Sequence, residues 1–168
     1  YQNLGLVYNS SGDIPKAFEN LELALKETQK TGDSLEIVHA YFNLGGMHAN
    51  NEDYVKSEEY FIKAREIAIR LNDKKIEAGA VNNLAWIYYF NKSYEKANEY
   101  FEEALKLRKQ IGDEIGLVET LNGIGTFYLG QKEFKKADFY CRKAYDEASR
   151  INYKLFHVIS IIISININ

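Results

Sequence analysis

The feature that most constrains this chain is a short motif that recurs every forty residues. It is most complete at residues 82–89, which read Asn-Asn-Leu-Ala-Trp-Ile-Tyr-Tyr. Altered copies occur at residues 2–8, 42–48 and 122–128. A fixed period of this length is typical of arrays in which one supersecondary unit stacks on the next. The period therefore divides the chain into four units, at about 1–33, 34–73, 74–113 and 114–153.

Each unit contains two segments in which apolar residues follow helical spacing, here called helix A and helix B. Helix A is predicted at about 34–49, 74–90 and 114–129, after a first copy that ends near residue 10. Helix B is predicted at about 54–71, 94–111 and 134–151. The turns that end the units, Gly32-Asp33, Asn72-Asp73 and Gly112-Asp113, pair a residue suited to a left-handed C-cap with an N-capping aspartate. Glu36 is expected to complete a capping box with Asp33.

Small residues recur at fixed positions of both helices. They are Gly5, Gly45, Ala85 and Gly125 on helix A, and Ala17, Ser57, Ala97, Ala137, Ala24, Ala64, Ala104 and Ala144 on helix B. Glycine inside a helix costs about 1 kcal/mol relative to alanine, so its recurrence indicates the close approach of a neighbouring helix. A large apolar residue lies beside them in three units, and Cys141 takes its place in the fourth. Cys141 is therefore predicted to be a core residue rather than a reactive thiol.

The composition argues against several classes of function. The net charge of −3 lacks the basic excess of a nucleic-acid-binding protein. The three histidines, His39, His48 and His157, do not cluster with cysteine or carboxylates at metal-ligand spacing. Gly123-Ile124-Gly125 lies within a repeat helix without the Gly-Lys-Ser/Thr of a phosphate loop. We therefore expect no metal, no cofactor and no enzymatic activity, and we interpret His48 as a packing residue.

The pattern Leu-Gly-x-x-Tyr, followed by Ala-x-x-x-Phe and Ala, resembles the tetratricopeptide repeat. It is carried by Leu4-Gly5-Tyr8, Leu44-Gly45, Leu84-Ala85-Tyr88 and Ile124-Gly125-Tyr128 on helix A, and by Ala17, Ala24, Phe61, Ala64, Ala97, Phe101, Ala104, Ala137 and Ala144 on helix B. The period is longer than the usual one of about 34, and the closing proline is missing. This long form resembles repeats of kinesin light chains, cell-polarity adaptors and bacterial peptide-sensing regulators. The resemblance implies an all-α fold, an α-solenoid of antiparallel helix pairs, whose A helices line a concave groove.

The resemblance also indicates which residues face that groove. In the family the residue before the Leu-Gly pair often does so, and here it is Asn3, Asn43, Asn83 and then Gly123. A carboxamide offers donors and an acceptor that match one peptide unit of an extended partner. The other groove residues expected are Phe42, Asn82, Asn122, His39, Trp86 and Tyr89, the last two as aromatic anchors. Alternatively, the asparagines only cap or bridge neighbouring helices.

The C-terminal segment departs from the repeat. Residues 155–165 read Leu-Phe-His-Val-Ile-Ser-Ile-Ile-Ile-Ser-Ile and begin where a fifth helix A would begin. Such a segment could cover the fourth unit, associate with a second copy of the chain, or begin a longer membrane segment. At about a dozen residues it is too short to span a bilayer. We favour packing of residues 154–168 on the fourth unit.

Two hypotheses of function remain open. The first is a non-enzymatic module that binds a protein or peptide in the groove. The second is a sensory or regulatory arm of a larger signalling protein, in which the groove binds a ligand or an attached effector domain. The chain begins inside a repeat and without methionine, so we expect it to be part of a longer protein. The sequence does not identify the partner.

Overall fold

The computed structural model describes residues 1–153, which form a series of α-helices. The helices are α1 (Gln2–Ser11), α2 (Ile14–Thr31), α3 (Ser34–Asn50), α4 (Tyr54–Arg70), α5 (Lys74–Phe90), α6 (Tyr94–Ile111), α7 (Glu114–Gly130) and α8 (Phe134–Arg150). Within residues 1–153 there is no strand, which confirms the all-α prediction. The odd-numbered helices are the A helices and the even-numbered ones are the B helices. Residues 154–168, with the apolar segment 155–165, lie outside the described residues.

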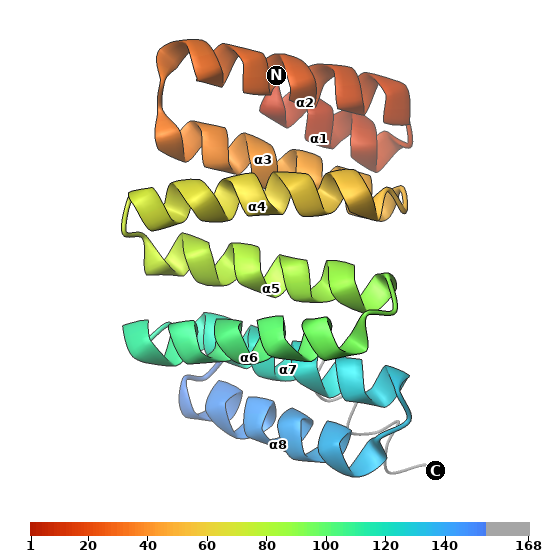
Figure 1. The fold of residues 1–168 in the computed structure, drawn as a ribbon, viewed down its shortest axis with the longest axis vertical. Helices are drawn as coiled ribbons and strands as arrows, with labels where there is room; N and C mark the ends of the chain where they lie inside the picture. The colour runs from red at the N-terminus through yellow and green to blue at the C-terminus, as the bar shows by residue number, and fades with distance from the viewer. Residues whose placement is uncertain (154–168) are drawn as a thin grey trace.

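The helices form a layered stack that runs from the first unit to the last (Figure 1). Each A helix packs on the B helix that follows it, and each B helix packs on the next A helix. The A helices also contact one another directly, α1 with α3 and α5 with α7. The stack is the helical-repeat solenoid that the sequence predicts, and it makes the A helices adjacent elements of one layer.

The turns between units form as the sequence predicts. Gly32, Asn72 and Gly112 adopt the left-handed conformation, with φ of 71°, 54° and 66°. Asp33 caps α3 by accepting hydrogen bonds from the backbone N–H groups of the second and third residues after it. The expected capping box is wrong, however, because the Asp33 N–H donates to Thr31 Oγ1 at 3.4 Å instead of to Glu36. A threonine two residues before the cap satisfies this donor locally.

The recurring small residues lie where two helices of a unit cross. A Cβ atom on Gly45 would lie 2.9 Å from the Phe61 ring, and one on Gly125 would lie 2.4 Å from Cys141 Sγ. Both distances are shorter than a van der Waals contact, so the glycines allow the helices to approach closely. Cys141 is fully buried, and burial raises the pKa of its thiol to about 11. The prediction that Cys141 is a core residue is confirmed.

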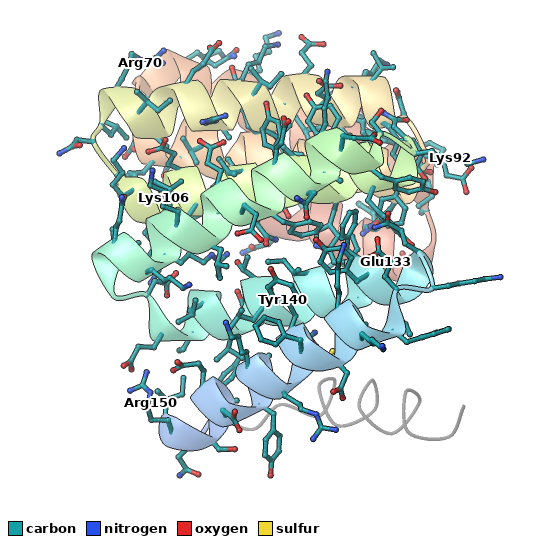
Figure 2. All side chains as sticks on the ribbon, turned by 60° about the horizontal axis from the view of Figure 1, so that its bottom comes forward. Arg70, Lys92, Lys106, Glu133, Tyr140 and Arg150 are labelled. Carbon is teal, nitrogen blue, oxygen red and sulfur yellow. The ribbon has the colours of Figure 1, made fainter. Side chains whose placement is uncertain are left out.

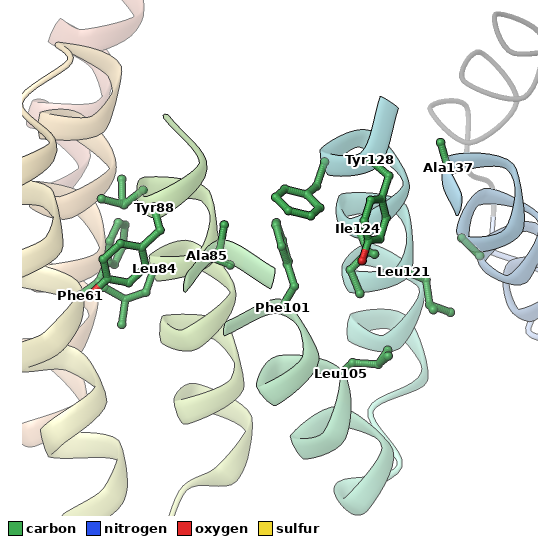
Figure 3. Packing of buried hydrophobic residues seen from close by; sticks show 14 residues of the cluster. Phe61, Leu84, Ala85, Tyr88, Phe101, Leu105, Leu121, Ile124, Tyr128 and Ala137 are labelled. Carbon is green, nitrogen blue, oxygen red and sulfur yellow. The ribbon is translucent and has the colours of Figure 1, made fainter. Parts of the chain in front are cut away.

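Consecutive units are joined by a tyrosine that repeats with the period. Tyr88 Oη in α5 donates to Glu58 Oε1 in α4 at 2.6 Å, and Tyr128 Oη in α7 donates to Asn98 Oδ1 in α6 at 2.7 Å. The core continues across the same junctions, and Figure 3 shows side chains of α6 facing side chains of α7. Each unit therefore depends on its neighbour for burial and for hydrogen bonding.

Candidate binding face

The two layers of helices differ sharply in charge. Beyond its first six residues, no A helix in residues 1–153 carries Asp, Glu, Lys or Arg. The B helices alternate acidic and basic residues along their length, and Lys106 and Arg150 project outward from α6 and α8 (Figure 2). Charged residues are usually exposed to solvent, so a face rich in them is usually a solvated surface rather than a binding surface. Beyond those first six residues, the layer of A helices is therefore the surface best suited to contact another molecule over a large area.

Four of the predicted groove residues lie on the accessible side of the A helices, here called the A-helix face. Asn3 and His39 are exposed, and Asn43 and Asn83 are half-buried. In the described part of the chain, neither the Asn43 nor the Asn83 carboxamide makes a hydrogen bond to another residue. These groups are therefore free to bond water or a bound molecule. Gly46 lies one turn after Asn43, and apart from its own helix backbone and its chain neighbours no atom lies within 4 Å of the position its Cβ would take.

Three other predicted residues, Phe42, Asn82 and Tyr89, lie in the seam between successive A helices. Asn122 is half-buried in α7, and no A helix follows α7 within residues 1–153. Asn82 Oδ1 accepts a hydrogen bond from Thr120 Oγ1 at 3.3 Å, which joins α5 to α7. The Phe42 ring packs 5.8 Å from that of Phe61, and the Tyr89 ring packs 5.8 Å from that of Phe127. Asn82 therefore bridges two neighbouring helices, which is the alternative to a groove-facing role that the sequence left open.

Trp86 explains why the row of asparagines ends after Asn83. The forty-residue register places Gly123 next in the row, and a Cβ atom there would lie 3.4 Å from the Trp86 ring and 3.3 Å from the Phe101 ring. Trp86 itself is half-buried, with its ring centroid 5.2 Å from that of Phe101. The indole thus covers the position that a fourth asparagine would need. The sequence signal for this arrangement is the coincidence of the single tryptophan with the one break in the row.

Cavities occur beside the first A helices and at the turns between units. One cavity of about 480 Å³ brings the predicted residues Asn3 and His39 together with Gln2 and Glu36. A larger one of about 710 Å³ lies between the turns that precede α5 and α7, and none of the predicted site residues lines it. The first cavity therefore marks one end of the A-helix face.

His48 is a packing residue, as predicted, but its surroundings are more polar than the sequence suggests. It is 6% exposed, and its ring lies 4.7 Å from Phe18 and 5.5 Å from Tyr60. Its Nδ1 lies 3.2 Å from Asp53 Oδ2, beside a cavity of about 350 Å³ that Lys56 also lines. The position is occupied by tyrosine in the other units. Burial lowers the pKa of His48, an effect that Asp53 opposes.

We expect the stability of the fold to fall as the pH falls through the range in which histidine titrates. The pKa of His48 is lowered in the fold, so the unfolded chain binds the proton at a higher pH, near 6.5. The stabilisation is complete above about pH 6.5 and is lost as the pH falls towards the lowered pKa. Thermal melts between about pH 7.5 and 5.5, the range around the ordinary histidine pKa, would show it.

The histidine responsible can be identified with two variants. His48→Phe keeps a ring between Phe18 and Tyr60 but cannot titrate, so its melting temperature should depend less on pH. The matched control is His39→Gln, which changes an exposed histidine and should keep the parent's pH dependence. An unchanged dependence in His48→Phe would show that another group causes it.

Two other kinds of site, a metal-binding cluster and a membrane-spanning helix, are not found within residues 1–153. In residues 1–153 no three His, Cys, Asp or Glu side chains come together as a possible metal site. Among α1–α8, none is both long enough and apolar enough to cross a membrane.

The structure is similar to several solved helical-repeat proteins. BtubC (BKLC) from P. vanneervenii gives a TM-score of 0.80 at 20% identity, over 96% of this chain and 68% of that one. A Rap protein complexed with Competence and Sporulation Factor gives 0.64 at 20% identity, over 98% of this chain and 49% of that one. A STAND protein with a tetratricopeptide repeat sensor, from Pyrococcus horikoshii, gives 0.73 at 21% identity, over 92% of this chain and 24% of that one. At these identities the similarity establishes the fold.

The sequence establishes the family. No curated protein sequence matches the chain significantly. Residues 36–110 and 77–149, however, match the family described as the tetratricopeptide repeat, and together they span well over half of the chain. The resemblance inferred from the Leu-Gly and alanine positions is thus confirmed, and the chain belongs to the tetratricopeptide repeat family.

Proposed function

We propose that the A-helix face binds a protein or peptide segment without catalysing a reaction on it. The observation that carries this proposal is the absence of charged residues beyond the first six of each A helix, in a layer where the carboxamides of Asn43 and Asn83 have no partner within residues 1–153. A carboxamide can donate to a backbone C=O and accept from a backbone N–H of the same partner residue. Since the A helices carry no charge beyond their first six residues, the matching partner is an extended segment that is itself mostly uncharged.

The similar structures support the same class of function. The Rap protein has the same fold and was solved with Competence and Sporulation Factor bound. Helical-repeat arrays commonly use the extended surface of one layer for recognition. A non-enzymatic binding module therefore accounts for the fold and the charge distribution together.

A second candidate function is a sensory or regulatory arm of a larger signalling protein. It is favoured by the similarity to the STAND protein, in which a tetratricopeptide repeat region is the sensor. This chain spans about a quarter of that protein and about half of the Rap protein. In such an arm the same A-helix face would bind the signal, so both candidates predict the same binding residues.

The binding face is tested by selecting ligands from a library of random peptides displayed on phage and titrating one selected peptide by calorimetry. Asn83→Ala should weaken binding by about 1–2 kcal/mol, because the partner's backbone group is left unpaired. Its free energy of unfolding should change by less than about 0.5 kcal/mol, as for other surface substitutions. Trp86→Ala should weaken binding more, but it also removes the packing on Phe101, so a stability measurement must accompany it.

A steric variant and a matched control make the test sharper. Gly46→Leu places a side chain in open space on the A-helix face and should weaken binding at least about tenfold, or 1.4 kcal/mol. The control is Lys106→Ala, which changes an exposed residue of the B layer and should leave the affinity unchanged. If Asn83→Ala loses stability but keeps its affinity, Asn83 is a structural residue and the proposed face is wrong.

A further inference from the structure

The outer side of α4 carries three exposed apolar side chains in one line. Val55, Ile62 and Ile69 are 77%, 38% and 52% exposed, and each is seven residues from the next. Positions seven residues apart drift by only about 20° around a helix, so the three side chains form a single stripe, here called the α4 stripe. A single exposed apolar residue is ordinary on a protein surface. A line of β-branched residues at this spacing is typical of the contact between two helices.

The repeat itself does not require apolar residues at these positions. The three corresponding positions are also exposed in α2, α6 and α8. They carry polar or charged residues with the exception of one proline, and they are Pro15, Glu22, Gln29, Glu95, Glu102, Lys109, Lys135, Arg142 and Ser149. Other residues, such as Phe61 and Ala64, form the core side of α4. The α4 stripe is therefore a feature of this one helix and indicates a contact outside the packing of the repeats.

The charged residues beside the stripe alternate in sign along α4. They are Lys56, Glu59, Lys63 and Glu66, and their side chains reach solvent. At about 100° per residue, all four lie on the same side of the stripe. Within one chain Lys63 Nζ donates to Glu59 Oε1 at 2.5 Å, which holds both groups on this side. Any helix that packs along the stripe therefore meets an alternating row of charges.

An antiparallel pair of α4 helices brings opposite charges together. Lys56 and Glu66 are centred on the residue before Ile62. Glu59 and Lys63 are centred on the same residue, so one antiparallel register places each lysine opposite a glutamate of the second copy. A parallel pair would instead place each carboxylate beside its own counterpart. The charges thus make this surface complementary to a second copy of itself in the antiparallel orientation.

The apolar side chains fit the same register. Val55 and Ile69 are centred on Ile62, one residue from the centre of the charges. In the charge-matched register Val55 therefore lies beside Ile69 of the second copy, displaced along the helix by two residues, or about 3 Å. Ile62 lies beside its own counterpart with the same displacement. This offset lets the side chains interlock instead of meeting end to end.

We propose that two copies of the chain associate through the α4 stripe, with the two α4 helices antiparallel and a two-fold axis beside Ile62. The occupant of the stripe is a second copy because the charges and the apolar residues match one another in one register. One pair of helices buries less area than the roughly 1,200–2,000 Å² of a stable interface, so the dimer dissociates readily. The A helices form the other layer of the stack, so the dimer leaves both A-helix faces accessible.

Cysteine cross-linking in the full chain tests this arrangement. Ile62→Cys lies next to the two-fold axis and should form a disulfide between two chains on mild oxidation. Val55→Cys should not link to itself, because its two copies lie at opposite ends of the contact, about 20 Å apart. A mixture of Val55→Cys and Ile69→Cys chains should give the mixed disulfide. The control is Ile115→Cys in α7, where the parent side chain is 49% exposed. The buried Cys141 stays in every variant, and the parent chain measures any disulfide that it forms.

Two results of the cross-linking would overturn the proposal. If Ile62→Cys links no faster than Ile115→Cys, the α4 stripe is not a contact between copies. If Val55→Cys links to itself as readily as to Ile69→Cys, the two helices are not antiparallel in this register.

Analytical ultracentrifugation tests the same contact without cysteine. The parent chain should show a monomer–dimer equilibrium as its concentration is raised. Ile62→Glu places two carboxylates side by side near the axis and should weaken the dimer at least about tenfold, or 1.4 kcal/mol. Ile115→Glu adds the same charge at another exposed apolar position and should leave the dimer unchanged. A parent that stays monomeric at millimolar concentration, or a dimer that Ile62→Glu does not weaken, would refute the proposal.

An exchange of charges tests the register. Glu59→Lys places lysines opposite each other at both symmetric positions and should weaken the dimer. Adding Lys63→Glu exchanges the two charges and restores the opposite pairing, so the double variant should dimerise like the parent. If the double variant dimerises as weakly as Glu59→Lys alone, Glu59 and Lys63 do not face each other across the contact and the proposed register is wrong.

Discussion

Phe101→Ala is expected to lower the free energy of unfolding by about 3–5 kcal/mol, the range found when a buried phenylalanine is truncated. Phe101 is fully buried in α6. Its ring centroid lies 5.2 Å from that of Trp86 in α5 and 5.5 Å from that of Phe127 in α7. It therefore fills the space between its own unit and the next, and a cavity there weakens both junctions. Urea denaturation followed by circular dichroism would measure the loss.

A phenylalanine of the next B helix provides the matched control. Phe139 in α8 is 51% exposed, and Lys143 Nζ lies 4.3 Å from the centre of its ring. Phe139→Ala removes the same atoms but leaves no buried cavity, so it should cost less than about 1 kcal/mol, the scale of an exposed cation–π contact. Equal losses in the two variants would contradict the assignment of Phe101 to the core between units.

The helices and their order could be predicted because the repeat supplies the same information several times. A single copy of the pattern around Leu84 and Ala85 would be compatible with either a helix or a strand. Several copies in one register fix the period and thereby the helical repeat. The turns could be predicted equally well. Gly112 and Asn72 readily adopt the left-handed conformation that ends a helix, and the aspartate after each can cap the next helix. The capping box at Asp33 failed because Thr31, two residues earlier, competes for the same backbone N–H.

The candidate site could be predicted only in outline. Register alone places Asn43 and Asn83 on one side of the A helices, but it does not tell how far each side chain reaches towards the next unit. Asn82 differs from Asn83 by one position and bonds across the seam to Thr120. The distinction depends on the spacing between two units, which a single sequence does not contain. The filling of the Gly123 position by Trp86 is likewise a property of the packed pair of helices.

Ala104→Leu is expected to destabilise the fold by about 1–3 kcal/mol, because it adds a branched side chain to a closed helix crossing. Ala104 is fully buried in α6, in one cluster with Ala78 and Val81 of α5 and with Leu107. Every other unit also has alanine at this register, and all are nearly or fully buried. The larger side chain must either move α6 away from α5 or leave its preferred rotamer.

The matched control is Lys106→Leu, which introduces the same side chain on the exposed part of α6. Its free energy of unfolding should change by less than about 0.5 kcal/mol, because no neighbour is displaced. Both variants are compared by the urea concentration at the midpoint of unfolding. If the two midpoints agree, the crossing at Ala104 has room for a larger residue, and the recurrence of alanine at this register does not report close packing. A selective loss in Ala104→Leu shows that the small residues fix the spacing between helices A and B, and with it the spacing of the asparagines on the A-helix face.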